Sequence, residues 1–331
     1  MRLQEFTRHW ARQCLGIPRF SRESLRVNLH GVRLVVAYST GIDSTALLHL
    51  LHALAPTHNL TLIAAHAHHG LRPESDRELQ HARAVCAGLG LACETTHLPV
   101  TEQAHSGCGL EEAARNLRYA FLESVRARHD ADWIVTAHHA DDLAEDIILR
   151  LLRGAGWPGL GGMPGMDRNR RLLRPVLNWE KKQLQAFLED NRIPWHEDMS
   201  NANTDLTRNR VRHQILPLLR RENPAFSKTA THLWTLAHID QAYWSEQCEV
   251  RIEGPEHFLA AHFLDGHQAL RLRLFKAVLD ALGPGQARAD HILRLDRAWT
   301  EGKIDCCIQF PGDKHARITA AGILFVRKTR P

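Results

Sequence analysis

The feature that most constrains the fold is a short apolar run that leads through a small polar turn into a helix. Residues 34–38 (Leu-Val-Val-Ala-Tyr) are apolar and partly β-branched, which is typical of a buried strand. After the turn at residues 39–44 (Ser-Thr-Gly-Ile-Asp-Ser), leucines recur at helical spacing at Leu47, Leu48, Leu50, Leu51 and Leu54. Such a junction directs free backbone N–H groups and the positive end of the helix dipole to one point, which suits a phosphate.

The turn lacks the lysine of a P-loop and the three spaced glycines of a dinucleotide fingerprint. Its pattern, Ser-x-Gly-x-Asp-Ser, instead resembles the PP-loop of the ATP pyrophosphatases, usually Ser-Gly-Gly-x-Asp-Ser. The resemblance implies that Asp43 is catalytic and holds Mg²⁺, and that the whole turn binds ATP through Ser39, Thr40, Gly41, Ile42, Asp43 and Ser44. The alternative is an ordinary turn in which Asp43 or Ser44 only caps the helix.

Thr40 departs from the PP-loop pattern, because it stands where glycine is usual. If this position requires a positive φ, a β-branched residue is costly there. Other contacts would have to offset the strain of a positive φ at Thr40, and the sequence does not show such contacts. We therefore expect Thr40 to keep a negative φ and to point away from the phosphates.

Strands and helices alternate through the first half of the chain. We expect strands near residues 34–38, 60–66, 92–98 and 133–137, and helices near 74–89, 110–129 and 141–153. This order predicts an α/β fold, a parallel sheet with helices on both faces that is similar to the adenine nucleotide alpha hydrolases. The polar segments 39–44, 66–72 and 138–142 follow strands, so we expect them to meet at the carboxyl edge of the sheet.

The chain of 331 residues is long enough for two domains. We expect a PP-loop ATP-binding catalytic domain at residues 1–222 and a smaller, mainly helical domain at 223–331 that ends in short strands. The glycine- and proline-rich segment 154–165 predicts a mobile loop at the mouth of the site. Residues 151–230 carry 14 Lys and Arg against 8 Asp and Glu. That excess suggests a polyanionic partner such as nucleic acid, although a solvated helical surface would carry the same charge.

Cysteine usage and hydropathy exclude several classes of protein. The seven cysteines are scattered and odd in number, which argues against a disulfide framework and favours a reducing cytoplasm. No Cys-x-x-Cys occurs, so nothing supports an iron–sulfur cluster or a zinc ribbon. Residues 1–20 have no continuous apolar core and no run reaches the length of a membrane span, so we expect neither a signal peptide nor a membrane segment.

Asp142 and Glu145 form a second acidic group, three residues apart on one face of a predicted helix. Such a pair can bind Mg²⁺ or an ammonium group, although acidic residues are also common at helix N-termini. Further motifs follow the PP-loop in a fixed order at residues 66–72, 109–115, 136–142, 152–154, 174–177, 195–198 and 208–212. The ordered set, over residues 33–219, resembles the tRNA(Ile)-lysidine synthetases.

This resemblance implies a ligase that forms a carbon–nitrogen bond. ATP would adenylate O2 of the wobble cytidine in an isoleucine tRNA with a CAU anticodon, releasing pyrophosphate. Free L-lysine would then displace AMP to give lysidine. The implied cofactors are ATP and Mg²⁺. The implied location is cytoplasmic, with no membrane involved, and the question of whether the protein forms a homodimer stays open.

The resemblance also implies roles for individual residues. Asp142 and Glu145 would be catalytic together with Asp43, and would orient the lysine ammonium group. The adenosine end of ATP would lie beside His66, His69 and Arg72. Contacts with phosphate or tRNA would come from Arg115, Arg208 and Arg212, whose other interpretation is arginine on a helix surface.

Two alternatives remain at this stage. One is another PP-loop tRNA modifier, which thiolates cytidine, but that family usually carries Cys-x-x-Cys pairs, and this chain has none. The other, from a different class, is a tRNA-binding relative that has lost catalysis. Thr40 motivates this second alternative, and the retained acidic residues Asp43, Asp142 and Glu145 argue against it.

Overall fold

The computed structural model describes residues 29–68, 74–99, 110–196, 207–248, 250, 252 and 254–328. The chain divides into two compact units, Met1–Ile239 and Asp240–Pro331, and helix α10 (Phe226–Gln247) contains the point of division. The functional boundary that we expected between residues 222 and 223 stays a prediction. The segment before residue 29 lies outside the described residues.

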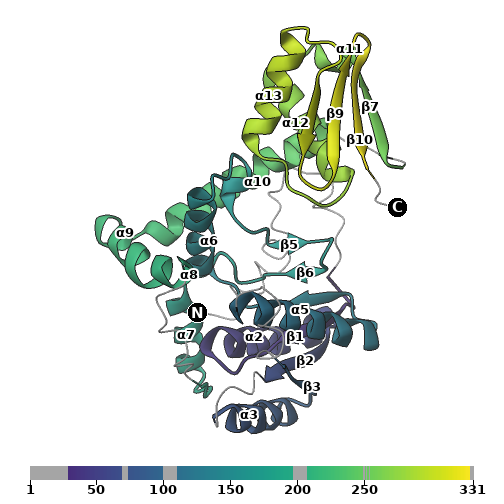
Figure 1. Ribbon diagram of the computed structural model, residues 1–331. Helices are drawn as coiled ribbons and strands as arrows, with labels where there is room; N and C mark the ends of the chain where they lie inside the picture. The colour runs from purple at the N-terminus through teal and green to yellow at the C-terminus, as the bar shows by residue number, and fades with distance from the viewer. Residues whose placement is uncertain are drawn as a thin grey trace. The chain divides into compact units, whose positions relative to one another are not determined.

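A six-stranded sheet forms the centre of the first unit (Figure 1). Its strands are β1 (Arg33–Ala37), β2 (Thr61–His68), β3 (Ala92–His97), β4 (Trp133–Val135), β5 (Met166–Asp167) and β6 (Leu172–Leu173). The spatial order is β3-β2-β1-β4-β6-β5, and only the β5–β6 pair is antiparallel. The predicted α/β fold is therefore confirmed, with two short strands, β5 and β6, that the sequence did not predict.

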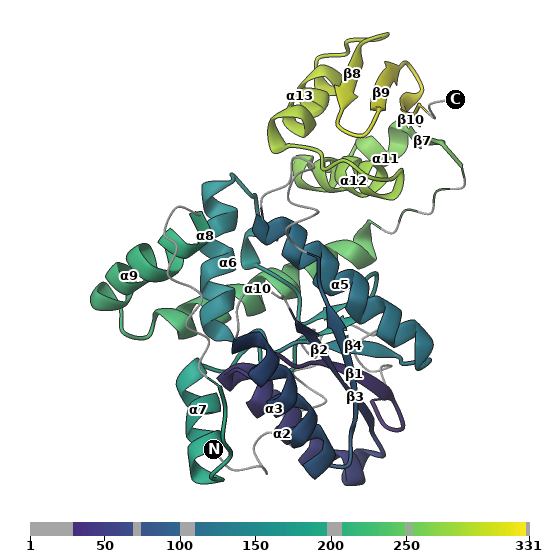
Figure 2. The ribbon, with the colours of Figure 1, turned by 60° about the horizontal axis from the view of Figure 1, so that its bottom comes forward.

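Helices cover both faces of this sheet. Helices α2 (Ile42–His58) and α3 (Glu74–Gly88) lie on one face, and α5 (Leu110–Arg128) lies on the other (Figure 2). Strand β1 shows the reason, because Leu34 and Val36 pack with the leucines of α2 whereas Val35 packs with Leu122 and Val125 of α5. A strand that is buried on both faces reads as a continuous apolar run.

The remaining helices of the first unit extend the fold beyond the sheet. They are α6 (Ala140–Leu152), the 3₁₀ turn η3 (Gly159–Gly161), α7 (Lys181–Asp190), α8 (Thr207–Arg210), the π-helical turn η4 (Val211–Ile215), α9 (Leu216–Glu222) and α10. Leu143 of α6, Val211 of η4 and Trp234 of α10 share one buried cluster. Gly161 packs so closely that an added Cβ would lie 2.2 Å from the Cβ of Ala237, so a larger residue does not fit there. The mobility expected for residues 154–165 stays a prediction.

Within the described residues, the second unit contains an antiparallel sheet of order β7-β10-β9-β8, three helices of its own and the C-terminal end of α10. The strands are β7 (Glu256–Ala260), β8 (Cys307–Phe310), β9 (Lys314–Thr319) and β10 (Gly322–Arg327), and the helices are α11 (Ala261–Leu264), α12 (Gln268–Ala281) and α13 (Ala289–Thr300). Phe275, Leu295 and Phe325 lie in its core. The expected terminal strands are confirmed as β8 to β10, whereas β7 was not predicted. In the part of the chain that the structure describes, no helix is both long and apolar enough to cross a membrane.

Candidate active site

A cavity of about 470 Å³ opens at the carboxyl ends of β1, β2 and β4, which are neighbours in the sheet. This is the edge at which the sequence predicted that three polar segments would meet. The predicted site residues that line the cavity are Ser39, Thr40, Gly41, Asp43, Ser44, His66, Asp142 and Arg212. They come from the PP-loop (residues 39–44), β2, α6 and η4.

Hydrogen bonds within the PP-loop hold its two serines together. The hydroxyl oxygens of Ser39 and Ser44 lie 3.1 Å apart, and Ser44 Oγ donates to the Gly41 carbonyl at 3.2 Å. Gly41 is the N-cap residue of α2, and no side chain caps this helix. Asp43 and Ser44 are therefore not helix caps, and the first-turn N–H groups stay available for a phosphate.

Thr40 corrects our expectation of a negative φ, because its φ is +66°. Three hydrogen bonds compensate for this left-handed conformation. The Thr40 carbonyl accepts from Thr45 Oγ1 at 3.1 Å and from His196 N at 3.0 Å, while Thr40 Oγ1 donates to the Ser39 carbonyl at 2.6 Å. The side chain is only 1% exposed. Gly41 has φ −70°, so the strained position is the one that glycine usually occupies.

Asp43 has one carboxylate oxygen that is suited to a cation. Its Oδ1 atom is buried and has no hydrogen-bond partner, and its Oδ2 atom lies 3.5 Å from Nε2 of His139. A buried, unpartnered carboxylate oxygen fits a hard cation such as Mg²⁺. No cluster of three or more His, Cys, Asp or Glu within the described residues could hold a metal by itself. An Mg²⁺ ion at Asp43 would therefore take further ligands from phosphate and water.

His139 connects Asp43 with the second acidic group. Its Nε2 atom lies 3.4 Å from Asp142 Oδ2 as well as 3.5 Å from Asp43 Oδ2, and its Nδ1 atom accepts from the Asp141 N–H at 3.2 Å. Since Nδ1 accepts, Nε2 carries a proton and donates toward the two carboxylates. Burial lowers the pKa of His139, but the carboxylates of Asp142 and Asp43 outweigh burial and raise the pKa.

Asp142 and Glu145 are both paired with arginine. Arg212 donates from its terminal nitrogen to Asp142 Oδ1 at 2.6 Å and from Nε to Glu145 Oε2 at 2.9 Å, and Arg208 pairs with the other Glu145 oxygen. Asp142 Oδ2 also accepts from the His139 N–H at 3.0 Å, so Asp142 caps α6 as well. Burial by itself would raise the pKa of Asp142. The effects of His139, His138 and Arg212 outweigh burial, so the pKa of Asp142 lies below its usual value and the group stays ionised.

Several predicted residues lie away from the cavity wall. Ile42, Glu145, Arg115 and Arg208 do not line it, and the Arg115 guanidinium lies 5.3 Å from the ring centre of Tyr119. His66 is buried, and its Nδ1 atom lies 2.9 Å from the Tyr38 carbonyl oxygen. His69 and Arg72 lie outside the described residues.

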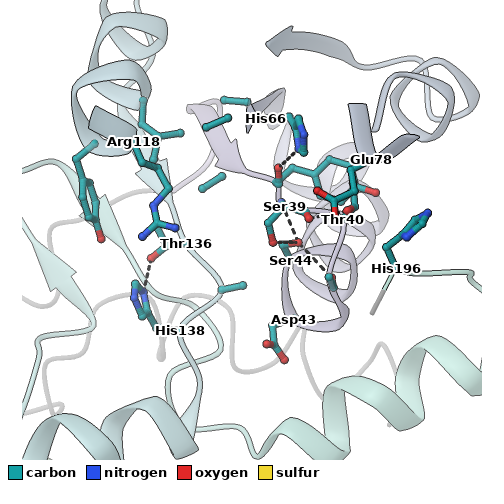
Figure 3. A pocket seen from close by; sticks show the side chains of 18 of the residues that line it. Ser39, Thr40, Asp43, Ser44, His66, Glu78, Arg118, Thr136, His138 and His196 are labelled. Atoms are coloured by element: carbon teal, nitrogen blue, oxygen red, sulfur yellow. Dashed lines mark hydrogen bonds between the residues drawn. The ribbon is translucent and has the colours of Figure 1, made fainter. Parts of the chain in front are cut away.

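The structure adds site residues that the sequence did not single out. Arg118, Thr136 and His138 lie across the cavity from the PP-loop (Figure 3). Glu78, His196 and Tyr119 also line the cavity. A signal for Arg118 was present, because it stands three residues after Arg115 and so shares a helix face with it. His138 and His139 lie inside the motif at residues 136–142, but the sequence assigned neither histidine a role.

Comparisons with known proteins show the family of the chain. The PP-loop domain family matches residues 19–219. A tRNA(Ile)-lysidine synthase of Nitratidesulfovibrio vulgaris is 44% identical, over 90% of this chain and 94% of that protein. Those of Alkalilimnicola ehrlichii and Bacillus subtilis are 46% and 37% identical, and this chain spans only 43% of the length of each.

Among solved structures, a U34-tRNA thiolase from Methanococcus maripaludis is similar, with a TM-score of 0.56 and 15% identity, over 76% of this chain and 82% of that chain. At this identity the likeness shows the fold alone. The family model covers more than half of the chain, and the Nitratidesulfovibrio relative matches nearly from end to end. The chain therefore belongs to the tRNA(Ile)-lysidine synthase family of PP-loop ligases.

Proposed function

We propose that this chain converts the wobble cytidine of an isoleucine tRNA into lysidine, with ATP and free L-lysine as co-substrates. The observation that carries the proposal is the arrangement around one cavity. Asp43 of the PP-loop and Asp142, the member of the acidic pair that lines the cavity, are linked through His139, at 3.5 Å and 3.4 Å. A nucleotide site and a cation site are thus close enough for two consecutive steps on one base.

In the first step the PP-loop would hold the phosphates of ATP. The first-turn N–H groups of α2 supply hydrogen-bond donors without adding charge, and the hydroxyl groups of Ser39 and Ser44 would add two more on turning from their bonds within the loop. Mg²⁺, when bound at Asp43, would neutralise the phosphate oxygens on which negative charge collects. The cytidine O2 would bond to the α-phosphorus as the bond to pyrophosphate breaks, and pyrophosphate would leave with the electron pair.

In the second step Asp142 and Glu145 would orient the lysine ammonium group. Both carboxylates are occupied by arginine, Asp142 by Arg212 and Glu145 by Arg208 and Arg212. An incoming ammonium group would compete with these guanidinium groups for the same oxygens. The lysine nitrogen, once deprotonated, would bond to C2 of the base, and AMP would leave with the electrons of the C2–O2 bond.

The tRNA would be held through its phosphates by basic residues. Since Arg208 and Arg212 pair with site carboxylates, other arginines must supply much of this surface. Arg168, Arg170 and Arg171 are exposed in the loop between β5 and β6 and suit this role. Binding should therefore weaken as salt rises, because phosphate contacts release counterions. A cytoplasmic location and the state of association stay predictions.

The direct test is to incubate the protein with unmodified isoleucine tRNA, ATP, Mg²⁺ and radiolabelled lysine. We expect label in the RNA, with one AMP and one pyrophosphate formed for each lysine attached. Parallel reactions without ATP, or with a tRNA that has guanosine at the wobble position, should incorporate no label. Failure to label the cognate tRNA at any salt concentration would contradict the proposal.

A further inference from the structure

Arg118 is a cation in the cavity wall for which the described residues provide no anion. It lies on α5, four residues before Leu122, whose side chain packs against the sheet. Because α5 follows β3 in a parallel sheet, its N-terminal half lies at the carboxyl edge, where the cavity opens. Within the described residues, no hydrogen bond or ion pair holds the Arg118 guanidinium. It points toward the cavity, with Thr136 and His138 beside it (Figure 3).

Two other arginines, whose charges have the same sign, act on Arg118. Desolvation by the cavity walls lowers the pKa of Arg118; Tyr119 raises it in part, and Arg115 and Arg208 lower it further. Arg208 is neutralised by Glu145, and Arg115 lies against the ring of Tyr119. Arginine stays protonated even so, so an unneutralised guanidinium beside two others is held at an electrostatic cost. Binding of an anion would remove that cost.

Thr136 and His138 add polar groups to the same wall without adding charge. Their side chains are joined by a hydrogen bond of 2.8 Å between Thr136 Oγ1 and His138 Nδ1. Burial lowers the pKa of His138 to about 3, and Arg174, Arg208 and Arg115 also lower it. His138 is therefore neutral at physiological pH, and the positive charge that faces the cavity here belongs to Arg118.

We propose that Arg118, with Thr136 and His138 beside it, forms a second phosphate subsite that faces the PP-loop across the cavity. The PP-loop holds the two phosphates that leave as pyrophosphate, whereas Arg118 holds the oxygens of the phosphate that remains. This assignment rests on the proposed function, in which the α-phosphate stays on the base between the two steps. A phosphodiester of the RNA has the same oxyanion chemistry, and the cavity shared with the PP-loop favours the nucleotide.

The test compares Arg118→Met, which removes the charge, with Arg118→Lys, which keeps it. Binding of AMP, pyrophosphate and an anticodon stem-loop RNA is measured by calorimetry for each variant. Arg128→Met is the matched control, because Arg128 lies on the same helix but pairs with Glu94 at 3.1 Å. We expect Arg118→Met to weaken AMP binding about tenfold, pyrophosphate less than twofold and RNA less than twofold, with partial recovery in Arg118→Lys.

Each other outcome overturns the assignment in a distinct way. Equal losses for AMP and pyrophosphate, or no loss for AMP, would remove Arg118 from the nucleotide site. A loss confined to the RNA would move the subsite to a tRNA phosphate. These binding measurements need no lysine and no turnover. If AMP binding depends on Arg118 as expected but the protein forms no lysidine, the result would therefore count against the proposed function and not against the subsite. Thermal unfolding of each variant separates lost contacts from lost folding.

Discussion

The cavity of the first unit and the core of the second unit both bury charged side chains, but they neutralise those charges differently. In the cavity wall, carboxylates are held by other ionised groups, as Asp142 is by Arg212. In the second unit the buried ammonium group of Lys314 is 1% exposed, and it donates to the carbonyls of Leu279, Gly283 and Gly285 at 2.7, 3.0 and 2.7 Å.

The two arrangements differ in whether the protein itself satisfies all the polar atoms of the buried groups. Lys314 uses its three donors on three backbone carbonyls that follow or end α12, so nothing remains for a ligand. Among the residues that the structure describes, the cavity retains an Asp43 oxygen without a hydrogen-bond partner and an Arg118 guanidinium without a counter-ion. A group held by its own backbone stabilises the fold, whereas an incompletely satisfied group is held ready for a substrate. Changes in the cavity should therefore alter activity, and changes at Lys314 should alter stability.

The largest effect expected is on catalysis by Asp43→Ala. Removal of the carboxylate takes away the predicted Mg²⁺ ligand, so pyrophosphate release should fall at least about 1,000-fold. The melting temperature should change little, because Asp43 caps no helix. Pyrophosphate release is measured with cognate tRNA, and Asp43→Asn provides a variant of the same shape. Near-normal turnover in either variant would show that the Asp43 carboxylate is not needed for catalysis, and the cavity would then not differ from the core of the second unit in this respect.

The second prediction concerns Lys314→Met, which should destabilise the second unit by about 3 kcal/mol. Three buried carbonyls would lose their donor, and each unsatisfied group costs about 1–3 kcal/mol. Desolvation lowers the pKa of Lys314, so relief from burying the charge offsets part of that loss. Hydrogen exchange of residues 307–327 would report the change, with the exposed Lys303→Met as control. If Lys314→Met left hydrogen exchange unchanged but impaired ATP binding, Lys314 would serve activity and not the stability of the second unit.

A third change tests whether arginine and lysine compete for the acidic pair. Arg212→Met frees Asp142 Oδ1 and Glu145 Oε2 from their bonds of 2.6 and 2.9 Å. The KM for lysine should therefore fall, by about tenfold at most, while the affinity for ATP alone changes little. The exposed Arg221→Met serves as the control for loss of one positive charge. An increase in the KM for lysine would show that Arg212 assists lysine binding.

Local patterns predicted the β1–α2 junction well, because the apolar run and the leucine spacing lie within a few residues of one another. The pairing of Arg208 with Glu145 spans 63 residues and depends on how η4 and α6 pack, which no periodicity encodes. Strands β5 and β6 have two residues each, too few to show alternation. Lys314 was not anticipated either, because lysine at the start of a strand normally predicts an exposed position.

The smallest effect separates strain from hydrogen bonding at Thr40. Thr40→Gly removes the cost of a left-handed β-branched residue, about 1–2 kcal/mol, but it also loses the hydroxyl bond to Ser39 and adds freedom to the unfolded chain. Thr40→Ala loses the same hydroxyl and keeps the Cβ atom. We therefore expect the glycine variant to be more stable than the alanine variant by about 1 kcal/mol, and to stay close to the natural protein.

Denaturant unfolding of the two variants, with ATP binding measured in parallel, decides this last point. If the loop is held by its hydrogen bonds to Thr45 and His196, which use the Thr40 carbonyl, both variants should keep the loop and bind ATP within about threefold of the natural protein. An alanine variant as stable as the glycine variant would mean that φ at residue 40 is not strained in solution. The left-handed conformation of Thr40 would then cost no more than those of Asp305 and Asp313 in the second unit.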